Sequence, residues 1–372
     1  MLKVATVFSG IGAIEFALKR MNIEHEVIFA CDNGEREVAI DYEKEKPIVD
    51  SLNTPQEKKV YVEKLYAKKT KSKNYMQESY LANYPIKDDM FFQDVCLLDG
   101  KDFRGQVDLF VGGSPCQSFS SVGFEAGLDD TRGTLFYEFG RLVDEIQPKV
   151  FIYENVRNML NHDKRKTWKV VKSVFDKLNY DIKFDVLNAS DYGIPQTRRR
   201  LFVVGIRKDL KHEELMFPPK TKQLQFTAQD FLIESCAEGC FKSIDGEIIA
   251  EKNPGVIDSK YFLTPKLRAY VMCTGTKTFS MPIKIDLPIA RTLLKTMGNR
   301  HRAGVDNYYT VDGKIRMLSE REALRLMGFT DDFKQVVSRA QMYKQAGNSI
   351  VVDVMMAVVK EIYKTKVFEA IL

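Results

Sequence analysis

The sequence predicts an α/β fold, in which a doubly wound, mostly parallel sheet is joined to a second, smaller, loop-rich β domain. Three observations support this prediction. Up to about residue 210, short apolar runs of strand type alternate with amphipathic runs of helical period. Beyond that point the apolar runs are short and irregular and lie between turn-forming residues. The length of 372 residues also exceeds that of one ordinary domain.

Six apolar runs are expected to form strands, because each is short and rich in β-branched and aromatic residues. They cover residues 3–8, 26–31, 107–113, 149–155, 181–189 and 199–207, and residues 91–95 are a further candidate. Amphipathic spacing predicts helices at residues 13–21, 35–45, 134–146 and 167–180. Strand–helix units repeated in this way place helices on both faces of a sheet.

The texture of the chain suggests its division into domains. Residues 1–210 and 346–372 are expected to form the large domain, residues 211–318 the smaller domain, and residues 319–345 a hinge region. The hinge region opens with a helix that Ser319 and Glu322 would start as a capping box. The last helix, expected to begin at Asn348 or Ser349, would dock on the large domain. Residues 46–73 are charged and lack a strand pattern, which indicates a surface insertion, helical in part.

Composition limits the class of protein. The net charge of +5 and the isoelectric point of 8.6 are compatible with a nucleic-acid partner, although an even scatter of basic residues gives the same sum. No apolar run approaches the roughly 18 residues of a membrane span. The N-terminus lacks a signal-peptide pattern, so we expect a cytoplasmic protein without membrane contact. The cysteines lack framework spacing, which favours reduced thiols, and the Cys236–Cys240 pair has no second pair, so no metal is expected.

The turn after the first strand is a candidate cofactor site. Gly10 and Gly12 in "VFSGIGAIEFAL" would let the backbone approach a ligand closely at the carboxyl end of a parallel strand. Asp32 follows the second strand and suits ribose hydroxyls, while Asp94 suits the amino group of an adenine. The pattern favours a nucleoside-bearing cofactor without a pyrophosphate, such as S-adenosylmethionine. The alternative is a plain strand–turn–helix with surface acids.

Three further stretches carry reactive side chains. Cys116 in "GGSPCQSFS" follows a strand in a loop of small residues, where a thiolate nucleophile would be exposed to substrate. Glu154 ends a buried strand, and strand alternation puts Arg198 and Arg200 on one face with Arg199 on the other. Taken singly, each has an unreactive alternative: an inert core thiol, a solvated loop acid and a solvated basic edge.

Together these pieces resemble the cytosine-5 DNA methyltransferases, in particular the single-chain bacterial type found with restriction systems. The stretches "GGSPCQSFS", "ENV", "Q-x-R-x-R" and "QAGNSI" carry the resemblance in this order and at these separations. It covers nearly all of the chain except residues 46–73 and the variable region at about residues 211–285. The resemblance implies a Rossmann-like methyltransferase fold, with residues 211–318 as the target recognition domain.

The resemblance assigns catalytic roles residue by residue. Cys116 would attack C6 of the target cytosine, and Glu154 would hydrogen-bond N3 and the exocyclic N4. Arg200 would contact O2 of the base, with Arg198 supporting the same site. The loop around the nucleophile would be shaped by Pro115 and Gln117.

The resemblance also assigns the S-adenosylmethionine site. Phe8 would lie against the adenine, Asp32 would bind the ribose and Asp94 the adenine N6. The full set of cofactor residues is Phe8, Gly10, Ile11, Gly12, Ala13, Asp32, Asp94, Val95, Leu135, Asn348 and Ser349. Two positions depart from the family pattern, because Ala13 stands where a second glycine is usual and Asp32 where glutamate is usual.

The implied activity is the methylation of duplex DNA at C5 of a flipped-out cytosine, as the modification enzyme of a restriction–modification system. We expect a monomer that binds double-stranded DNA. A cognate restriction endonuclease of the same system would not bind it stably. A tRNA methyltransferase on the same fold and a non-catalytic binding protein are the rival interpretations. The target sequence is not readable, and residues 46–73 are either a contact to the DNA backbone or a solvated surface, the second being favoured.

Overall fold

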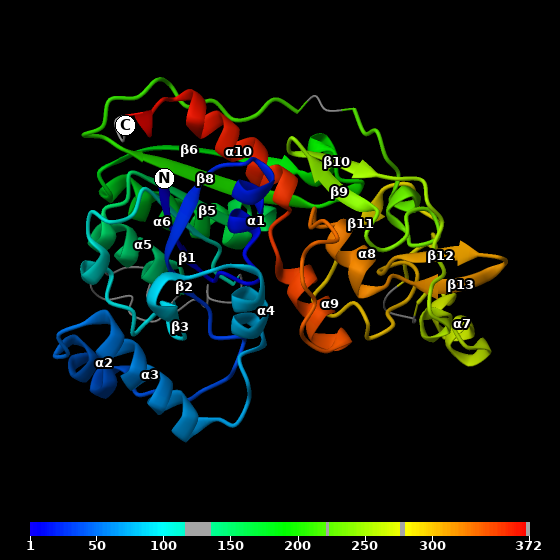
Figure 1. Cartoon of the computed structure of the whole chain (residues 1–372), viewed down its shortest axis with the longest axis horizontal. Coiled ribbons are helices and arrows are strands. Elements are labelled where there is room, and N and C mark those ends of the chain that lie inside the picture. Colours follow the sequence, from blue (N-terminus) through cyan, green and yellow to red (C-terminus); the bar gives the residue numbers. More distant parts are fainter. Residues whose placement is uncertain (116–134, 221–222, 276–279, 370–372) are drawn as a thin grey trace.

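A seven-stranded sheet forms the centre of the large domain in the computed structural model, which describes residues 1–115, 135–220, 223–275 and 280–369 (Figure 1). Its strand order is β3-β2-β1-β4-β5-β8-β6. The bounds are β1 Leu2–Val7, β2 His25–Cys31, β3 Phe91–Phe92, β4 Leu109–Gly112, β5 Val150–Val156, β6 Tyr180–Asn188 and β8 Arg199–Arg207. All pairs are parallel except those of β8, which runs antiparallel to β5 and β6. The predicted α/β class with a mostly parallel sheet is confirmed.

Helices cover both faces of this sheet. Helices α1 (Ala13–Arg20) and α10 (Val352–Lys364) pack in one core cluster with Val4 of β1 and Ile152 of β5. Helices α5 (Leu135–Ile146) and α6 (Lys166–Lys177) pack on the other face in a cluster rich in aromatic rings. The strand β8 reverses direction because only residues 189–198 link it to β6, too few for a crossover connection to a parallel strand.

The segment between β2 and β3 holds three helices, α2 (Tyr42–Asp50), α3 (Pro55–Lys69) and α4 (Tyr75–Asn83). The helical character expected within residues 46–73 is confirmed. The helix expected at residues 35–45 is wrong, because α2 begins only at Tyr42, where Asp41 caps it by accepting the Lys44 amide. Residues 46–73 are also more than a solvated surface, since Val49, Val62 and Tyr66 are buried in a small cluster of their own.

The remaining part of the chain forms short strands and loops, as predicted. The strands pair in two hairpins, β9 (Phe241–Ile244) with β10 (Glu247–Ala250) and β12 (Tyr308–Val311) with β13 (Lys314–Met317), while β7 (Gln196–Thr197) pairs with β11 (Ala290–Arg291). Three helices complete it: α7 Pro265–Val271, α8 Glu320–Arg325 and α9 Arg339–Asn348. Short 3-10 turns lie at Lys87–Asp89, Gly100–Phe103, Arg157–Leu160, His162–Arg165, Ala189–Tyr192, Ala228–Phe231 and Ser259–Tyr261. The proposed domain boundaries themselves stay predictions.

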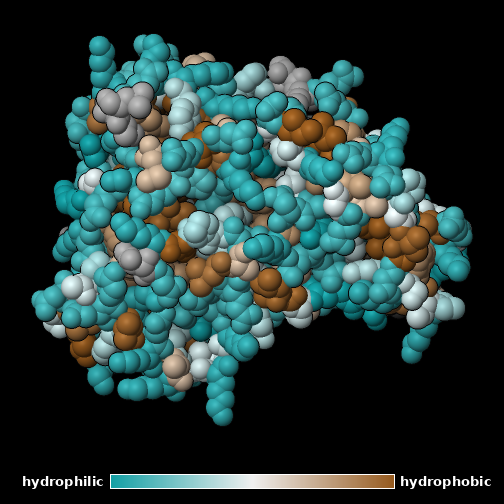
Figure 2. All heavy atoms as spheres, viewed as in Figure 1, coloured by the Kyte–Doolittle hydropathy of each residue, from teal (hydrophilic) through white to brown (hydrophobic). Residues whose placement is uncertain are grey.

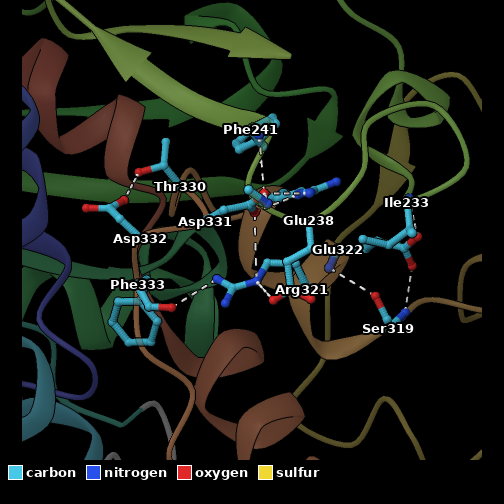
Figure 3. A network of polar contacts seen from close by, with 12 residues as sticks. Ile233, Glu238, Phe241, Ser319, Arg321, Glu322, Thr330, Asp331, Asp332 and Phe333 are labelled. Carbon is cyan, nitrogen blue, oxygen red and sulfur yellow. Dashed lines mark hydrogen bonds and ion pairs between the residues drawn. The ribbon is translucent and has the colours of Figure 1, made fainter. Parts of the chain in front are cut away.

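The start of α8 shows why this region holds its shape. Ser319 and Glu322 form the predicted capping box, and the same carboxylate accepts the amide of Ile233 at 2.8 Å (Figure 3). Asp331 accepts the amide of Phe241 and pairs with the buried Arg325 guanidinium. These bonds tie residues 233–241 to α8 and the turn that follows it.

The last helix begins later than expected. Asn348 is the final residue of α9, and α10 starts at Val352, so the start at Asn348 or Ser349 is wrong. The physical reason is that the carbonyls of Gly347 and Ser349 bond to the Arg198 guanidinium, which keeps residues 349–351 out of a continuous helix. No helix in the described part of the chain has the length and apolar character to cross a membrane.

Candidate active site

The carboxyl ends of β1, β4 and β5 surround a pocket. It is lined by the loop between β1 and α1, by Gly112 and Gly113 at the end of β4, by Glu154 on β5, and by residues 348–350. Segments far apart in the sequence therefore meet at one edge of the sheet, where ligands bind in open α/β folds. Of the predicted residues, Phe8, Gly10, Ile11, Ala13, Glu154, Asn348 and Ser349 line this pocket.

The loop between β1 and α1 has an unusual backbone path. Phe8, Gly10 and Gly12 have positive φ angles of 54°, 55° and 75°. Glycine is required at position 12, because a Cβ there would lie 2.2 Å from the ring of Tyr84. Asp32 holds the loop, since its carboxylate accepts the Gly10 amide at 2.9 Å and the Gly34 amide at 2.8 Å. Burial raises the pKa of Asp32 against these two hydrogen bonds.

Asp94 and Val95 lie away from this pocket, beneath the inserted helices. The Asp94 carboxylate accepts the hydroxyls of Tyr66 at 2.9 Å and Tyr42 at 3.2 Å. Burial raises the pKa of Asp94, and these donors together with the Cys96 amide oppose that rise. Val95 and Leu135 pack against the aromatic core cluster. Sequence reasoning missed both tyrosines, whose only signal was an aromatic character inside a charged stretch.

Glu154, which lines the pocket, lies beside Arg200. The Arg200 Nε atom lies 3.3 Å from Glu154 Oε1, and the glutamate side chain is only 13% exposed, so it is not a solvated loop acid. Burial raises the pKa of Glu154, while the charges of Arg200 and Arg198 lower it, and the net direction is upward. The absence of a side chain at Gly113 lets the Glu154 carboxylate lie close to the backbone at the end of β4. A Cβ at this position would lie only 2.9 Å from Glu154 Oε2.

Arg198 lies behind the pocket and not against its acid. Its buried guanidinium donates to three backbone carbonyls, those of Leu293 at 3.0 Å, Gly347 at 3.0 Å and Ser349 at 2.8 Å. Burial, together with the nearby charge of Arg200, lowers the pKa of Arg198 to about 9. Arg198 therefore holds the segments that carry Leu293 and Ser349 in place, and this is a positioning role.

A model of the C-5 cytosine-specific DNA methylases matches residues 56–364. The chain belongs to this family. It is 34% identical over 288 residues to the type II methyltransferase M.HhaI of Haemophilus parahaemolyticus, covering 76% of this chain and 82% of that protein. It is 33% identical over 301 residues to the type II methyltransferase M.SsoII of Shigella sonnei, covering 78% of this chain and 72% of that protein. The predicted family and enzyme class are confirmed: the protein is a cytosine-5 DNA methyltransferase of the type II kind.

The fold of this chain is similar to that of solved methyltransferase structures. The S. pombe Dnmt2 methyltransferase superposes with a TM-score of 0.65 at 17% identity, covering 100% of this chain and 99% of that chain. A putative DNA modification methyltransferase of an E. coli prophage superposes with a TM-score of 0.61 at 21% identity, covering 99% and 100%. At these identities the likeness concerns the fold alone.

Two predicted residues of the methyltransferase, Cys116 and Gln117, lie outside the described residues. Pro115, which precedes them, is exposed at the end of the described segment.

On the other side of the pocket, the Asn348 side-chain amide donates to Glu35 Oε1 at 3.0 Å. Lys295 and Lys344 pair with the same carboxylate at 3.1 and 2.6 Å. Burial alone would raise the pKa of Glu35, but these two lysines lower it below its usual value. Sequence reasoning gave no signal for this cluster.

Proposed function

We propose that this methyltransferase flips one cytosine out of duplex DNA and methylates C5 through a covalent bond between Cys116 and C6. We propose further that it acts as a monomer, as the modification enzyme of a restriction–modification system, with no stable binding to an endonuclease. The observation that carries the proposal is the Glu154–Arg200 pair, whose acid lines the pocket beside the β1–α1 loop. An acid and a guanidinium side by side there match the donors and acceptors on the cytosine edge.

The residues around the pocket fit S-adenosylmethionine. Phe8 and Gly10, in the left-handed turn that Gly12 completes, line the pocket, and so do Asn348 and Ser349. When bound, this cofactor supplies the methyl group that C5 receives. Asp32 is proposed for the ribose, although in the structure its carboxylate already holds the Gly10 amide. Asp94 and Val95 are proposed for the adenine, although in the structure the Asp94 carboxylate accepts two tyrosine hydroxyls. Leu135 is proposed to close the pocket with Asn348 and Ser349.

The chemistry of the chain's own residues follows from the poor nucleophilicity of C5 in an aromatic ring. The Cys116 thiolate would add to C6, and the electrons of the C5–C6 double bond would move toward C5. A protonated Glu154 would hydrogen-bond N3 and so stabilise the charge that develops in the ring. Its raised pKa favours this protonated form. After methyl transfer a base removes the C5 proton, and the returning electrons expel the thiolate.

Access to C6 requires the base to leave the stack, at a cost of a few kcal/mol. We assign residues 211–318 to target recognition, residues 319–345 to the hinge and the remainder to the catalytic domain. Recognition would read base edges in the major groove, while phosphate contacts fix the register.

The decisive experiment is covalent trapping on duplex DNA that contains 5-fluorocytosine, in which the missing C5 proton prevents release. The wild-type protein with S-adenosylmethionine should form a complex stable to denaturation, and Cys116→Ala should form none. Absence of the complex with the wild type, or its persistence in Cys116→Ala, would overturn the mechanism. Methylation of duplex DNA measured against tRNA decides the substrate class, and bisulfite sequencing of DNA from expressing cells identifies the target.

A further inference from the structure

The end of strand β4 leads directly into the stretch that carries Cys116. Main-chain pairing of β4 with β5 ends at Gly112 and Tyr153. Two residues later the buried Ser114 hydroxyl forms a 2.7 Å hydrogen bond with the Tyr153 hydroxyl, in which either group can donate. A side-chain bond thus continues the attachment of the chain to β5 after the strand ladder has stopped.

Asn155 completes this attachment. Its Nδ2 atom donates to the Tyr153 hydroxyl at 2.8 Å and to the Ser114 carbonyl at 2.9 Å. Its Oδ1 atom accepts the amide of Val156 at 2.8 Å, which fixes the orientation of the amide. Ser114, Tyr153 and Asn155 are each at most 4% exposed. Hydrogen bonds among buried groups are not exchanged with water, so their geometry is well defined.

The position of Tyr153 is fixed from behind by rings. It packs edge-on against Phe136 and Phe175 and in a tilted arrangement against Phe139, all from helices α5 and α6. Because the Tyr153 side chain is held in this way, its hydrogen bond holds Ser114 in a fixed position relative to the sheet. Ser114 precedes Cys116 by two residues in the sequence, so a fixed Ser114 sets the point from which the chain continues toward the nucleophile.

We propose that Tyr153 is a positioning residue of the methyltransferase, which fixes the start of the nucleophile loop through the Ser114 hydroxyl. The inference rests on the proposed role of Cys116. Attack on C6 needs a sulfur placed close to the ring and in line with it, and loss of such placement lowers the rate of the chemical step more than binding. A merely structural hydroxyl would leave the rate of that step unchanged.

The test is a double-mutant cycle of Tyr153→Phe and Ser114→Ala. Each single variant should lower the single-turnover rate of methylation and of 5-fluorocytosine adduct formation by about tenfold, equivalent to about 1.4 kcal/mol. The dissociation constants for S-adenosylhomocysteine and for duplex DNA should not change. Both substitutions remove the Ser114–Tyr153 bond, and Tyr153→Phe also removes the hydroxyl that accepts from Asn155. The double variant should therefore be about as slow as Tyr153→Phe alone, and not slower by about a hundredfold.

Tyr180→Phe is the matched control. Its buried hydroxyl donates to the Pro148 carbonyl at 2.6 Å, at the other end of β5, so it should reduce stability without slowing the reaction. An unchanged rate in Tyr153→Phe and Ser114→Ala, fully multiplicative effects, or an equal rate loss in Tyr180→Phe would overturn the proposal. Failure of the proposed function is distinct, because then the wild type itself would form no adduct.

A second surface is defined by residues 64–73, at the end of α3 and just beyond it. This basic segment holds five exposed lysines and no acid. Its charge of +5 is as large as the net charge of the whole chain. Its lysines are Lys64, Lys68, Lys69, Lys71 and Lys73. A helix C-terminus favours cations, but two of them lie past the last residue of α3, so the helix dipole does not explain the segment.

Lysines earlier in the same helix behave differently. Lys58 is buried and pairs with Asp99 and Asp102, and Lys59 pairs with Asp89. In the basic segment, Lys64, Lys68 and Lys71 have no ion pair with any described residue. The paired lysines fix α3 on the large domain, and the unpaired ones carry free charge.

The basic segment is anchored beside the active site. The next residue, Asn74, donates from its side chain to the Asp32 carbonyl at 2.7 Å, and the Tyr75 carbonyl accepts from Gln345 of α9 at 2.8 Å. In Figure 1 the segment lies at the lower edge, between α3 and α4, on the side toward α9. Figure 2 shows mostly hydrophilic side chains along this edge, with some hydrophobic groups among them, and a concave outline.

We infer that the basic segment contacts phosphates of duplex DNA that flank the target site. This rests on the proposed duplex substrate. The probe is a fluorescent duplex containing the target, bound in the presence of S-adenosylhomocysteine over a series of salt concentrations. Replacing Lys64, Lys68 and Lys71 by Ser should reduce the slope of log K against log salt by about 0.9 for each phosphate that the variant no longer neutralises, at most about 2.7.

The control replaces Lys169, Lys177 and Lys208, three exposed lysines on α6 and after β8. The slope of this control should equal that of the wild type. An unchanged slope after replacement in the basic segment, or an equal change in the control, would overturn the inference. If the wild type binds no duplex at all, the proposed function fails instead.

Discussion

Replacing Glu15 by Gln should abolish a loss of stability that the wild-type protein suffers as pH rises. Glu15 lies in the first turn of α1, which follows the β1–α1 loop, and it is fully buried. Its Oε1 atom accepts the hydroxyls of Tyr80 and Thr6, whereas Oε2 has no hydrogen-bond partner in the described structure. A bare oxygen in this setting suits a neutral carboxyl and penalises an ionised one.

The magnitude follows from the pKa. Burial raises the pKa of Glu15 from 4.5 to about 7, against the hydrogen bonds that it accepts. The folded protein therefore binds the proton more tightly than the unfolded chain, so the contribution is present below pH 4.5 and is lost as pH rises through 7. At 1.36 kcal/mol for each pKa unit, the loss is about 3 kcal/mol between these limits.

The assay is denaturant unfolding of the wild type and Glu15→Gln across this pH range. The difference between their unfolding free energies isolates Glu15, because other titrating groups are common to both proteins. The unfolding free energy of the Gln variant, relative to that of the wild type, should rise by about 3 kcal/mol from acid to neutral pH. A difference that stays constant with pH would refute the reasoning. Since Thr6 also bonds to Ser9 in the β1–α1 loop, to which the proposed cofactor site belongs, the same titration should weaken S-adenosylmethionine binding at high pH.

Three further predictions concern residues in the pocket and behind it. Gly113→Ala should lower kcat at least tenfold in steady-state methylation with little effect on duplex binding, because its Cβ would push Glu154 aside; an active variant would contradict this. Arg198→Met should lower the unfolding free energy by about 3 kcal/mol in denaturant titration, since three buried carbonyls lose a charged donor. The single-turnover rate should fall as pH rises through the pKa of Glu154, because the proton for N3 is then lost; Glu154→Gln, which cannot ionise, should lack this alkaline limb, and an identical pH profile would exclude the donor role.

Local pattern was sufficient for most elements of the fold. The run at residues 199–207 became β8 with the same bounds, and the helix predicted at residues 13–21 became α1, Ala13–Arg20. The Ser319–Glu322 capping box was also readable, since its partners are three residues apart. The helix expected at residues 35–45 failed because helical spacing continued through a stretch in which Asp41 caps the chain and starts α2 instead.

The sequence by itself determined the strand–helix order, the family and the chemical nature of the reactive residues, because these depend on residue type and short spacing. Only the tertiary structure decided which partners those residues meet. Asp94 bonds to Tyr66, 28 residues away, and Arg198 to the carbonyl of Ser349, 151 residues away. Burial then shifts their pKa values, as for Arg198, whose pKa falls to about 9. Such contacts follow from the packing of distant elements, and no local period or motif encodes that packing.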